Sequence, residues 1–88
     1  MTDYNGYTNH ATWNVSLWLN GVEADYRHAA DFMRSYRGST PYRDYIRHAH
    51  LGRAKTPDGV AYLDPAVDVA ELDEVLREIA RTEGEARP

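Results

Sequence analysis

The chain has 88 residues, a net charge of -4 and no cysteine. This length supports one domain with a modest core, and the lack of cysteine excludes disulfide frameworks and thiolate metal sites. The first twenty residues lack the basic start and apolar run of a signal peptide, and no stretch approaches the roughly 20 apolar residues of a membrane span, so we expect a single cytoplasmic domain over residues 1–88 with no membrane contact.

The N-terminal quarter predicts an extended lead-in followed by a helix. Residues 1–7 fit an extended segment, and Thr8 is a candidate N-cap for a helix over about residues 9–19. Apolar residues alternate within 12–19, which is also typical of a strand. Trp18 breaks the alternation, so we favour the helix and keep a strand there as the alternative.

A second helix is predicted from a capping pattern. Asn20 is followed three residues later by Glu23, which indicates a helix start, and apolar residues then repeat at helical spacing over about 21–37. Gly38 is a suitable C-terminal stop, because glycine adopts the left-handed conformation that ends many helices.

A short third helix and an irregular arm follow. Thr40-Pro41 predicts a helix start, because proline suits the first turn, and Gly52 is expected to end this helix. We expect residues 52–67 to form an irregular arm, because Thr56-Pro57-Asp58-Gly59 is a turn signal.

The clearest amphipathic helix lies near the C-terminus. Asp68 followed by Glu71 repeats the capping pattern, and an apolar stripe runs through about 69–82. Residues 83–88 are polar and are expected to be extended or frayed.

These elements predict a mainly α fold, a compact domain of three to four helices with an irregular arm at about 52–67. The fold becomes α+β if 12–19 is a strand. The expected core residues are the following: Trp13, Leu17, Tyr26, Met33, Ile46, Leu72, Leu76 and Ile79.

No catalytic, cofactor or metal site is expected. His48 and His50 lie two residues apart and would point about 200° from each other on a helix, so they cannot share a metal ion. No histidine pair has the i, i+4 spacing of helical zinc motifs, and no serine lies in a glycine-flanked elbow.

Charge is distributed unevenly, and this predicts a protein partner. Residues 64–88 carry eight acids against three arginines, and Glu71, Glu74 and Glu78 form an i, i+3, i+7 stripe that is either a solvated helix face or an acidic contact surface. We expect a basic partner to bind the following residues: Tyr62, Asp64, Asp68, Glu71, Glu74 and Glu78.

Two other modes of binding stay open. Four arginines could bind nucleic acid together with neighbouring tyrosines, and they are Arg34, Arg37, Arg43 and Arg47. The overall negative charge disfavours this mode of binding. The many tyrosines and tryptophans would also suit the interface of a homodimer, so the chain is expected to be a monomer or a homodimer.

The opening segment from Tyr4 to Leu19, YNGYTNHATWNVSLWL, resembles a family of small phage and plasmid proteins of unknown function whose opening is similar to YNGWTNYETWNVALWL. Tyr7 stands where that family has tryptophan, and Ala11 stands where it has glutamate, which removes the acid of a capping box. The stretches 58–65 and 71–74 also resemble the family's C-terminal half.

The resemblance implies mobile genetic elements, whose small acidic proteins often inhibit host defence. We therefore expect a non-enzymatic protein that binds and inhibits a defence component, either of a CRISPR–Cas system or of a restriction system. The small nucleic-acid-binding regulator and the structural homodimer are the alternatives.

Overall fold

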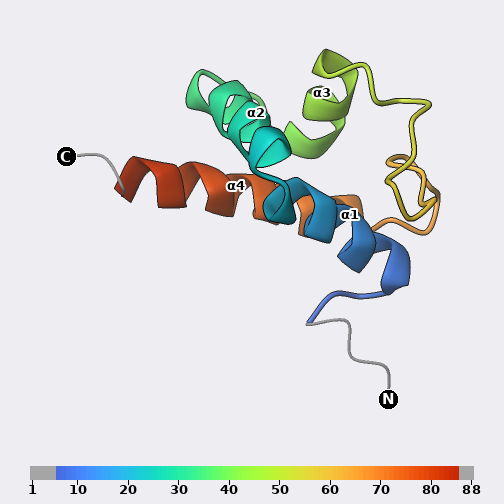
Figure 1. The fold of residues 1–88 in the computed structure, drawn as a ribbon. Helices are drawn as coiled ribbons and strands as arrows, with labels where there is room; N and C mark the ends of the chain where they lie inside the picture. Colours follow the sequence, from blue (N-terminus) through green and yellow to red (C-terminus); the bar gives the residue numbers. More distant parts are fainter. Residues whose placement is uncertain (1–5, 86–88) are drawn as a thin grey trace.

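The computed structural model of the chain describes residues 6–85, and within this range it contains four helices and no strand (Figure 1). The helices are α1 (His10–Gly21), α2 (Glu23–Arg34), α3 (Pro41–His48) and α4 (Val69–Glu85). The long α4 runs along the molecule, and α1, α2 and α3 all pack against it. The mainly helical fold is thereby confirmed, and the strand alternative for residues 12–19 is wrong.

The N-caps of the first two helices both differ from expectation. The N-cap of α1 is Asn9, whose side chain accepts the Thr12 backbone N–H at 2.9 Å. Asn20 lies inside α1 and donates to the Ser16 carbonyl, so it does not cap α2. Helix α2 begins instead after Val22, which is extended and supplies no side-chain cap.

Helix α2 ends at Arg34, well before the expected stop at Gly38. The chain then wraps around Tyr36, whose hydroxyl accepts the Thr40 backbone N–H at 2.9 Å and donates to Asp44 at 2.5 Å. A Cβ atom at position 38 would overlap this hydroxyl, so the glycine is needed for close approach rather than for ending the helix.

Helix α3 ends at His48 instead of running to Gly52. His50 has a φ of 59°, which places a non-glycine residue in the left-handed region. Its N–H donates to the Arg47 carbonyl at 3.2 Å, and the Leu51 N–H donates to the Ile46 carbonyl at 2.9 Å. This is the Schellman arrangement, in which the left-handed position is usually glycine.

The core is centred on α4, although the expected list is only partly right. Ile46, Leu72, Leu76 and Ile79 are buried as expected, but Leu17 is 43% exposed. The core also contains residues that the expected list omitted, among them Val15, Leu19, Tyr42 and Tyr45. Tyr26 and Met33 are partly buried against the core, and Trp13 is half-buried.

The buried face of α1 explains these errors. Thr12, Val15, Ser16 and Leu19 are buried and follow i, i+3, i+4, i+7 spacing, so half of this face is polar. An apolar pattern alone therefore favours the wrong side of the helix.

The N-termini of α1 and α4 complete each other's caps. Asp68 caps α4 by accepting the Glu71 N–H at 3.1 Å, as Asn9 caps α1 through Thr12. In an ordinary capping box the third helical side chain would then bond back to its own N-cap. Here the third residue of each helix bonds to the other helix's start instead. The N-cap Asp68 N–H donates to the Thr12 hydroxyl at 2.8 Å, and the N–H of Thr8, the residue before the N-cap Asn9, donates to the Glu71 carboxylate at 2.9 Å.

Residues 49–68 connect α3 to α4 and contain the expected irregular arm, and from here on the whole connection is called the arm. Side chains of α1 hold its turn. Buried Asn14 accepts from the Thr56 hydroxyl at 2.7 Å and donates to Asp58 at 2.7 Å, while the Trp18 indole donates to Asp58 at 2.9 Å. These two donors, Asn14 foremost, lower the pKa of Asp58. The ionised Asp58 carboxylate therefore stabilises the folded state at any pH above the ordinary aspartate pKa. This stabilisation is lost as the pH falls through the lowered pKa of Asp58 in the folded protein.

Helix α3 is held from both sides by buried polar contacts. Its first turn is capped from α4, since the Tyr42 backbone N–H donates to the buried Asp73 carboxylate at 2.8 Å. The Tyr42 hydroxyl donates to the Tyr62 carbonyl of the arm at 2.6 Å, and burial raises the pKa of Tyr42 far above its ordinary value. This hydrogen bond attaches the arm to α3.

We predict that His50→Gly stabilises the protein. Glycine removes the cost of a left-handed non-glycine residue, so the free energy of unfolding should rise by about 1 kcal/mol in urea denaturation. His48→Gly, two residues earlier and at the last position of α3, is the matched control. It should lower the free energy of unfolding by about 1 kcal/mol, because glycine destabilises a helix. A His50→Gly variant that is no more stable than the native chain would contradict the cap assignment.

Candidate functional site

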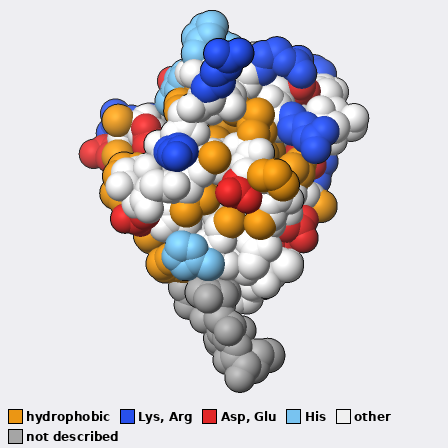
Figure 2. Space-filling view, turned by 90° about the vertical axis from the view of Figure 1, so that its right-hand side faces the viewer, with side chains coloured by type: hydrophobic (Ala, Val, Ile, Leu, Met, Phe, Trp, Pro, Cys, Tyr) orange, Lys and Arg blue, Asp and Glu red, His pale blue; other side chains and the backbone are white. Residues whose placement is uncertain are grey.

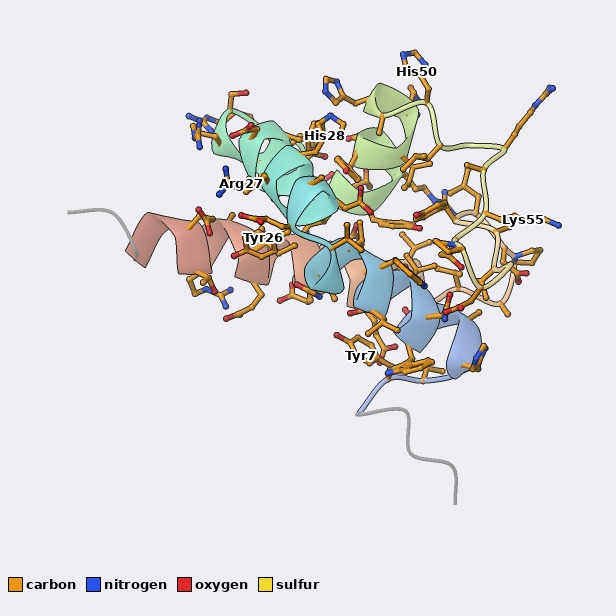
Figure 3. The ribbon with its side chains drawn as sticks, viewed as in Figure 1. Tyr7, Tyr26, Arg27, His28, His50 and Lys55 are labelled. Atoms are coloured by element: carbon orange, nitrogen blue, oxygen red, sulfur yellow. The ribbon has the colours of Figure 1, made fainter. Side chains whose placement is uncertain are left out.

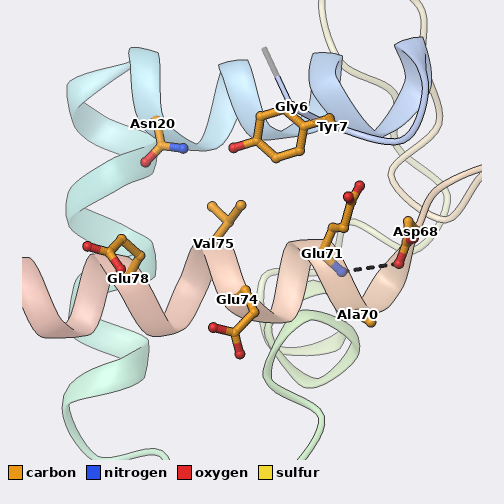
Figure 4. A pocket seen from close by; sticks show the side chains of 9 residues that line it. All are labelled: Gly6, Tyr7, Asn20, Asp68, Ala70, Glu71, Glu74, Val75 and Glu78. Atoms are coloured by element: carbon orange, nitrogen blue, oxygen red, sulfur yellow. Dashed lines mark hydrogen bonds between the residues drawn. The ribbon is translucent and has the colours of Figure 1, made fainter. Parts of the chain in front are cut away.

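A groove of about 540 Å³ runs between α1 and α4 (Figure 4). Its lining residues are Gly6, Tyr7, Asn20, Asp68, Ala70, Glu71, Glu74, Val75 and Glu78, and we call it the acidic groove. Tyr7 and Asn20 form the α1 wall, and the carboxylates project from the α4 wall. The structure thus brings together four of the six expected partner-binding residues.

The four carboxylates of the acidic groove fall into two kinds. Asp68 and Glu71 are committed to the exchanged caps, so their positions are fixed by the fold. Glu74 and Glu78 are exposed, and among residues 6–85 their ion-pair partners are arginines of their own helix, Arg77 for Glu74 at 2.7 Å and Arg81 for Glu78. Exposed pairs of this kind contribute little to stability and separate readily. Glu74 and Glu78 are therefore the groove carboxylates that an incoming partner can engage.

Tyr7 is the groove residue that the charge pattern did not indicate. It is half-buried, and its hydroxyl accepts a hydrogen bond from Ser16 at 2.6 Å. This contact fixes the ring on the α1 wall opposite Val75 (Figure 4). Only the packing of α1 on α4 brings the ring there, so no spacing rule could have found it.

The other two expected partner-binding residues lie elsewhere. Tyr62 is only 7% exposed, because its side chain belongs to the hydrophobic core, so it offers a partner little surface. Asp64 is half-buried and accepts the Ala66 backbone N–H at 2.8 Å. Both line a second groove, on the other side of the arm's junction with α4, and they do not contribute to the acidic groove.

The second groove, of about 450 Å³, lies between α3 and the arm. Its lining residues are Arg43, Ile46, Arg47, Gly52, Tyr62, Leu63, Asp64, Pro65, Val67 and Val69, and we call it the arginine groove. Figure 2 shows the side of the molecule that carries the arm, where hydrophobic side chains gather centrally and Lys and Arg side chains lie above them.

The four arginines considered for nucleic acid do not share one groove. Arg43 and Arg47 line the arginine groove, and Arg37 lines a hollow beside His28. Arg34 lines a further hollow beside Tyr26, and it pairs with Asp31 at 3.0 Å. The structure therefore supports a two-arginine surface rather than a four-arginine one.

The histidines gather in part on α2 and α3. His28 Nδ1 lies 3.2 Å from the Tyr45 hydroxyl, and its ring lies 5.7 Å from that of His48, whereas His50 projects beyond the end of α3 (Figure 3). Within residues 6–85, no group of three or more histidine or carboxylate side chains is arranged to hold a metal ion. Over the same residues, no helix has the length and apolar character needed to cross a membrane.

The chain matches the model of DUF7249, a family of unknown function, over residues 1–84, and it belongs to this family. No curated protein and no solved structure matches the chain. Membership agrees with the expected resemblance to a family without an assigned function, and it supplies neither an activity nor a partner.

We predict that the two kinds of groove carboxylate respond differently to charge reversal. The Glu74→Lys/Glu78→Lys double variant should change the free energy of unfolding by less than about 1 kcal/mol, because both residues make only exposed ion pairs. Glu71→Lys should lower it by about 1 to 2 kcal/mol, because the Thr8 N–H loses its acceptor. Urea denaturation measures both, and equal costs would show that Glu71 does not fasten α1 to α4.

Proposed function

We propose that this member of a family of unknown function is a non-enzymatic binding protein that docks a basic protein surface into its acidic groove. The observation that carries this proposal is the gathering of four carboxylates and the Tyr7 ring along one groove of about 540 Å³. A concave surface with carboxylates and an aromatic ring suits arginine and lysine side chains, because charge steers their approach and the ring supplies contact area.

The arrangement of these groups suits recognition rather than catalysis. Asp68 and Glu71 accept hydrogen bonds from the chain's own backbone, and Tyr7 accepts one from Ser16. Groups held in this way present a fixed pattern of charge and shape. A preformed surface of this kind loses little conformational entropy when a partner binds.

The partner that we propose is a host defence protein, and the setting is the cytoplasm of a bacterium that carries a phage or plasmid. The support for this finer proposal is the resemblance of the opening segment to phage and plasmid proteins. The mechanism is steric and electrostatic: the acidic groove occupies basic side chains with which a CRISPR–Cas or restriction component contacts DNA.

The alternative, a nucleic-acid-binding regulator, has weaker support. It would need Arg34, Arg37, Arg43 and Arg47 to act together, and only the last two share a groove. The other alternative, a homodimer, is tested by sedimentation of the native chain.

The test is an affinity capture from a bacterial lysate that contains an active CRISPR–Cas or restriction system. The native chain should recover a defence effector and block its DNA cleavage, and Glu74→Lys/Glu78→Lys should reduce both by at least about tenfold. These two residues are chosen because their reversal spares the caps that Glu71 supports.

The matched control is Glu23→Lys/Asp31→Lys on α2. It makes the same change in net charge at two exposed carboxylates that also pair with arginines of their own helix. The control should behave as the native chain does. Equal loss of binding in both variants would show that net charge, and not the acidic groove, causes the effect. Recovery of nucleic acid, or of nothing but the bait, would contradict the proposal for the systems present.

A further inference from the structure

The arginine groove is independent of the acidic groove and has a different chemistry. Its floor is apolar, with Ile46 fully buried and Tyr62 and Val67 less than a tenth exposed. No residue lines both grooves. A partner of the acidic groove therefore leaves the arginine groove open.

Leu63 makes the rim of this groove unusual. It is 46% exposed, and it is one of two large hydrophobic side chains within residues 6–85 that are left exposed in this way. The turn from Ala61 to Asp64 fixes its backbone, since the Asp64 N–H donates to the Ala61 carbonyl at 3.1 Å. An apolar side chain held at the edge of an apolar groove gains free energy when a second apolar side chain covers it.

The opposite rim is cationic. Arg43 and Arg47 lie about one turn apart on α3, and the described part of the chain gives the Arg43 guanidinium group no ion pair or hydrogen bond. Arg47 has an 81% exposed side chain and reaches only Asp44, at 3.5 Å. That carboxylate is already shared with Tyr36 and Thr40. Both guanidinium groups are therefore available to carboxylates from outside.

Asp64 is the one carboxylate in the groove, and it does not neutralise this rim. One of its oxygens accepts the Ala66 backbone N–H, which directs the carboxylate to the arm's own turn. The groove thus offers two cations along one side, an exposed leucine on the other and an apolar floor between them.

We propose that the arginine groove binds a short acidic peptide segment of a partner protein, with a large apolar side chain on the floor beside Leu63 and carboxylates on Arg43 and Arg47. The charge complementarity selects an acidic segment, and the floor selects an apolar residue within it. Planar guanidinium groups bind carboxylates through paired hydrogen bonds, which fixes the direction of the segment. Nucleic acid would use the arginines and leave Leu63 and the floor uncovered.

The experiment selects ligands from a displayed library of random peptides of about 12 residues on the immobilised full chain. We expect enrichment of sequences that combine leucine, isoleucine or phenylalanine with neighbouring aspartate or glutamate. Fluorescence anisotropy of an enriched peptide should show binding at least about tenfold weaker for Leu63→Ser and for Arg43→Glu/Arg47→Glu.

Two matched variants control this experiment. Leu17→Ser removes the other exposed leucine, and Arg27→Glu/Arg34→Glu reverses two exposed arginines on α2. Both should bind the enriched peptide as the native chain does. The four variants change only exposed positions. Circular dichroism melting checks that each variant is folded.

Three results would overturn the inference. The first is no enrichment, or enrichment of basic peptides. The second is a labelled oligothymidylate that binds the native chain and Leu63→Ser equally well and displaces the enriched peptide. The third is self-association in sedimentation that Leu63→Ser abolishes, which would assign the groove to a second copy of the chain. None of these results depends on the acidic groove, so the proposed function stands or falls separately.

Discussion

The exchange of hydrogen bonds between the starts of α1 and α4 is the contact on which the rest of the structure depends. The first N–H groups of a helix need partners from outside the helix. Here the Thr12 hydroxyl accepts the Asp68 N–H, and the Glu71 carboxylate accepts the Thr8 N–H. The Asn9 side-chain amide donates to the Ala66 carbonyl at 2.7 Å. Separating the two helices would leave these hydrogen-bonding groups without partners. The contact therefore joins segments that lie 56 to 63 residues apart in the sequence, and it sets the walls of the acidic groove.

Side chains of the opening segment, which carries the family resemblance, therefore make contacts that hold the fold together. Thr12 joins α1 to α4, Asn14 and Trp18 hold the turn of the arm, and Ser16 fixes the Tyr7 ring. Polar side chains on a buried helix face have to find partners, and several of the partners found here lie outside α1, in the arm and at the start of α4. The two surfaces for which we propose binding are the grooves that this segment helps to position, one acidic and one cationic and apolar.

The sequence alone predicted the parts of the fold that depend on local pattern. The amphipathic stripe of α4 and its cap at Asp68 were right, because apolar spacing and a side-chain cap are encoded within a few residues. The buried face of α1 was missed, because buried threonine, asparagine and serine carry no apolar signal. The acidic stripe was visible as spacing, whereas the Tyr7 wall and the arginine groove depend on contacts between segments far apart in the chain.

The most direct test of this account is the Thr12→Val substitution, which keeps the shape of a fully buried side chain and removes its hydroxyl. We expect the free energy of unfolding to fall by about 1 to 3 kcal/mol, because the Asp68 N–H is left without a partner, and amide hydrogen exchange at Asp68 to accelerate more than at Val15 within the core of α1. Thr82→Val, at an exposed position on α4, is the control and should change neither quantity appreciably. A Thr12→Val variant with native stability and native exchange at Asp68 would contradict the account, because the two helix starts would then be held together by something else.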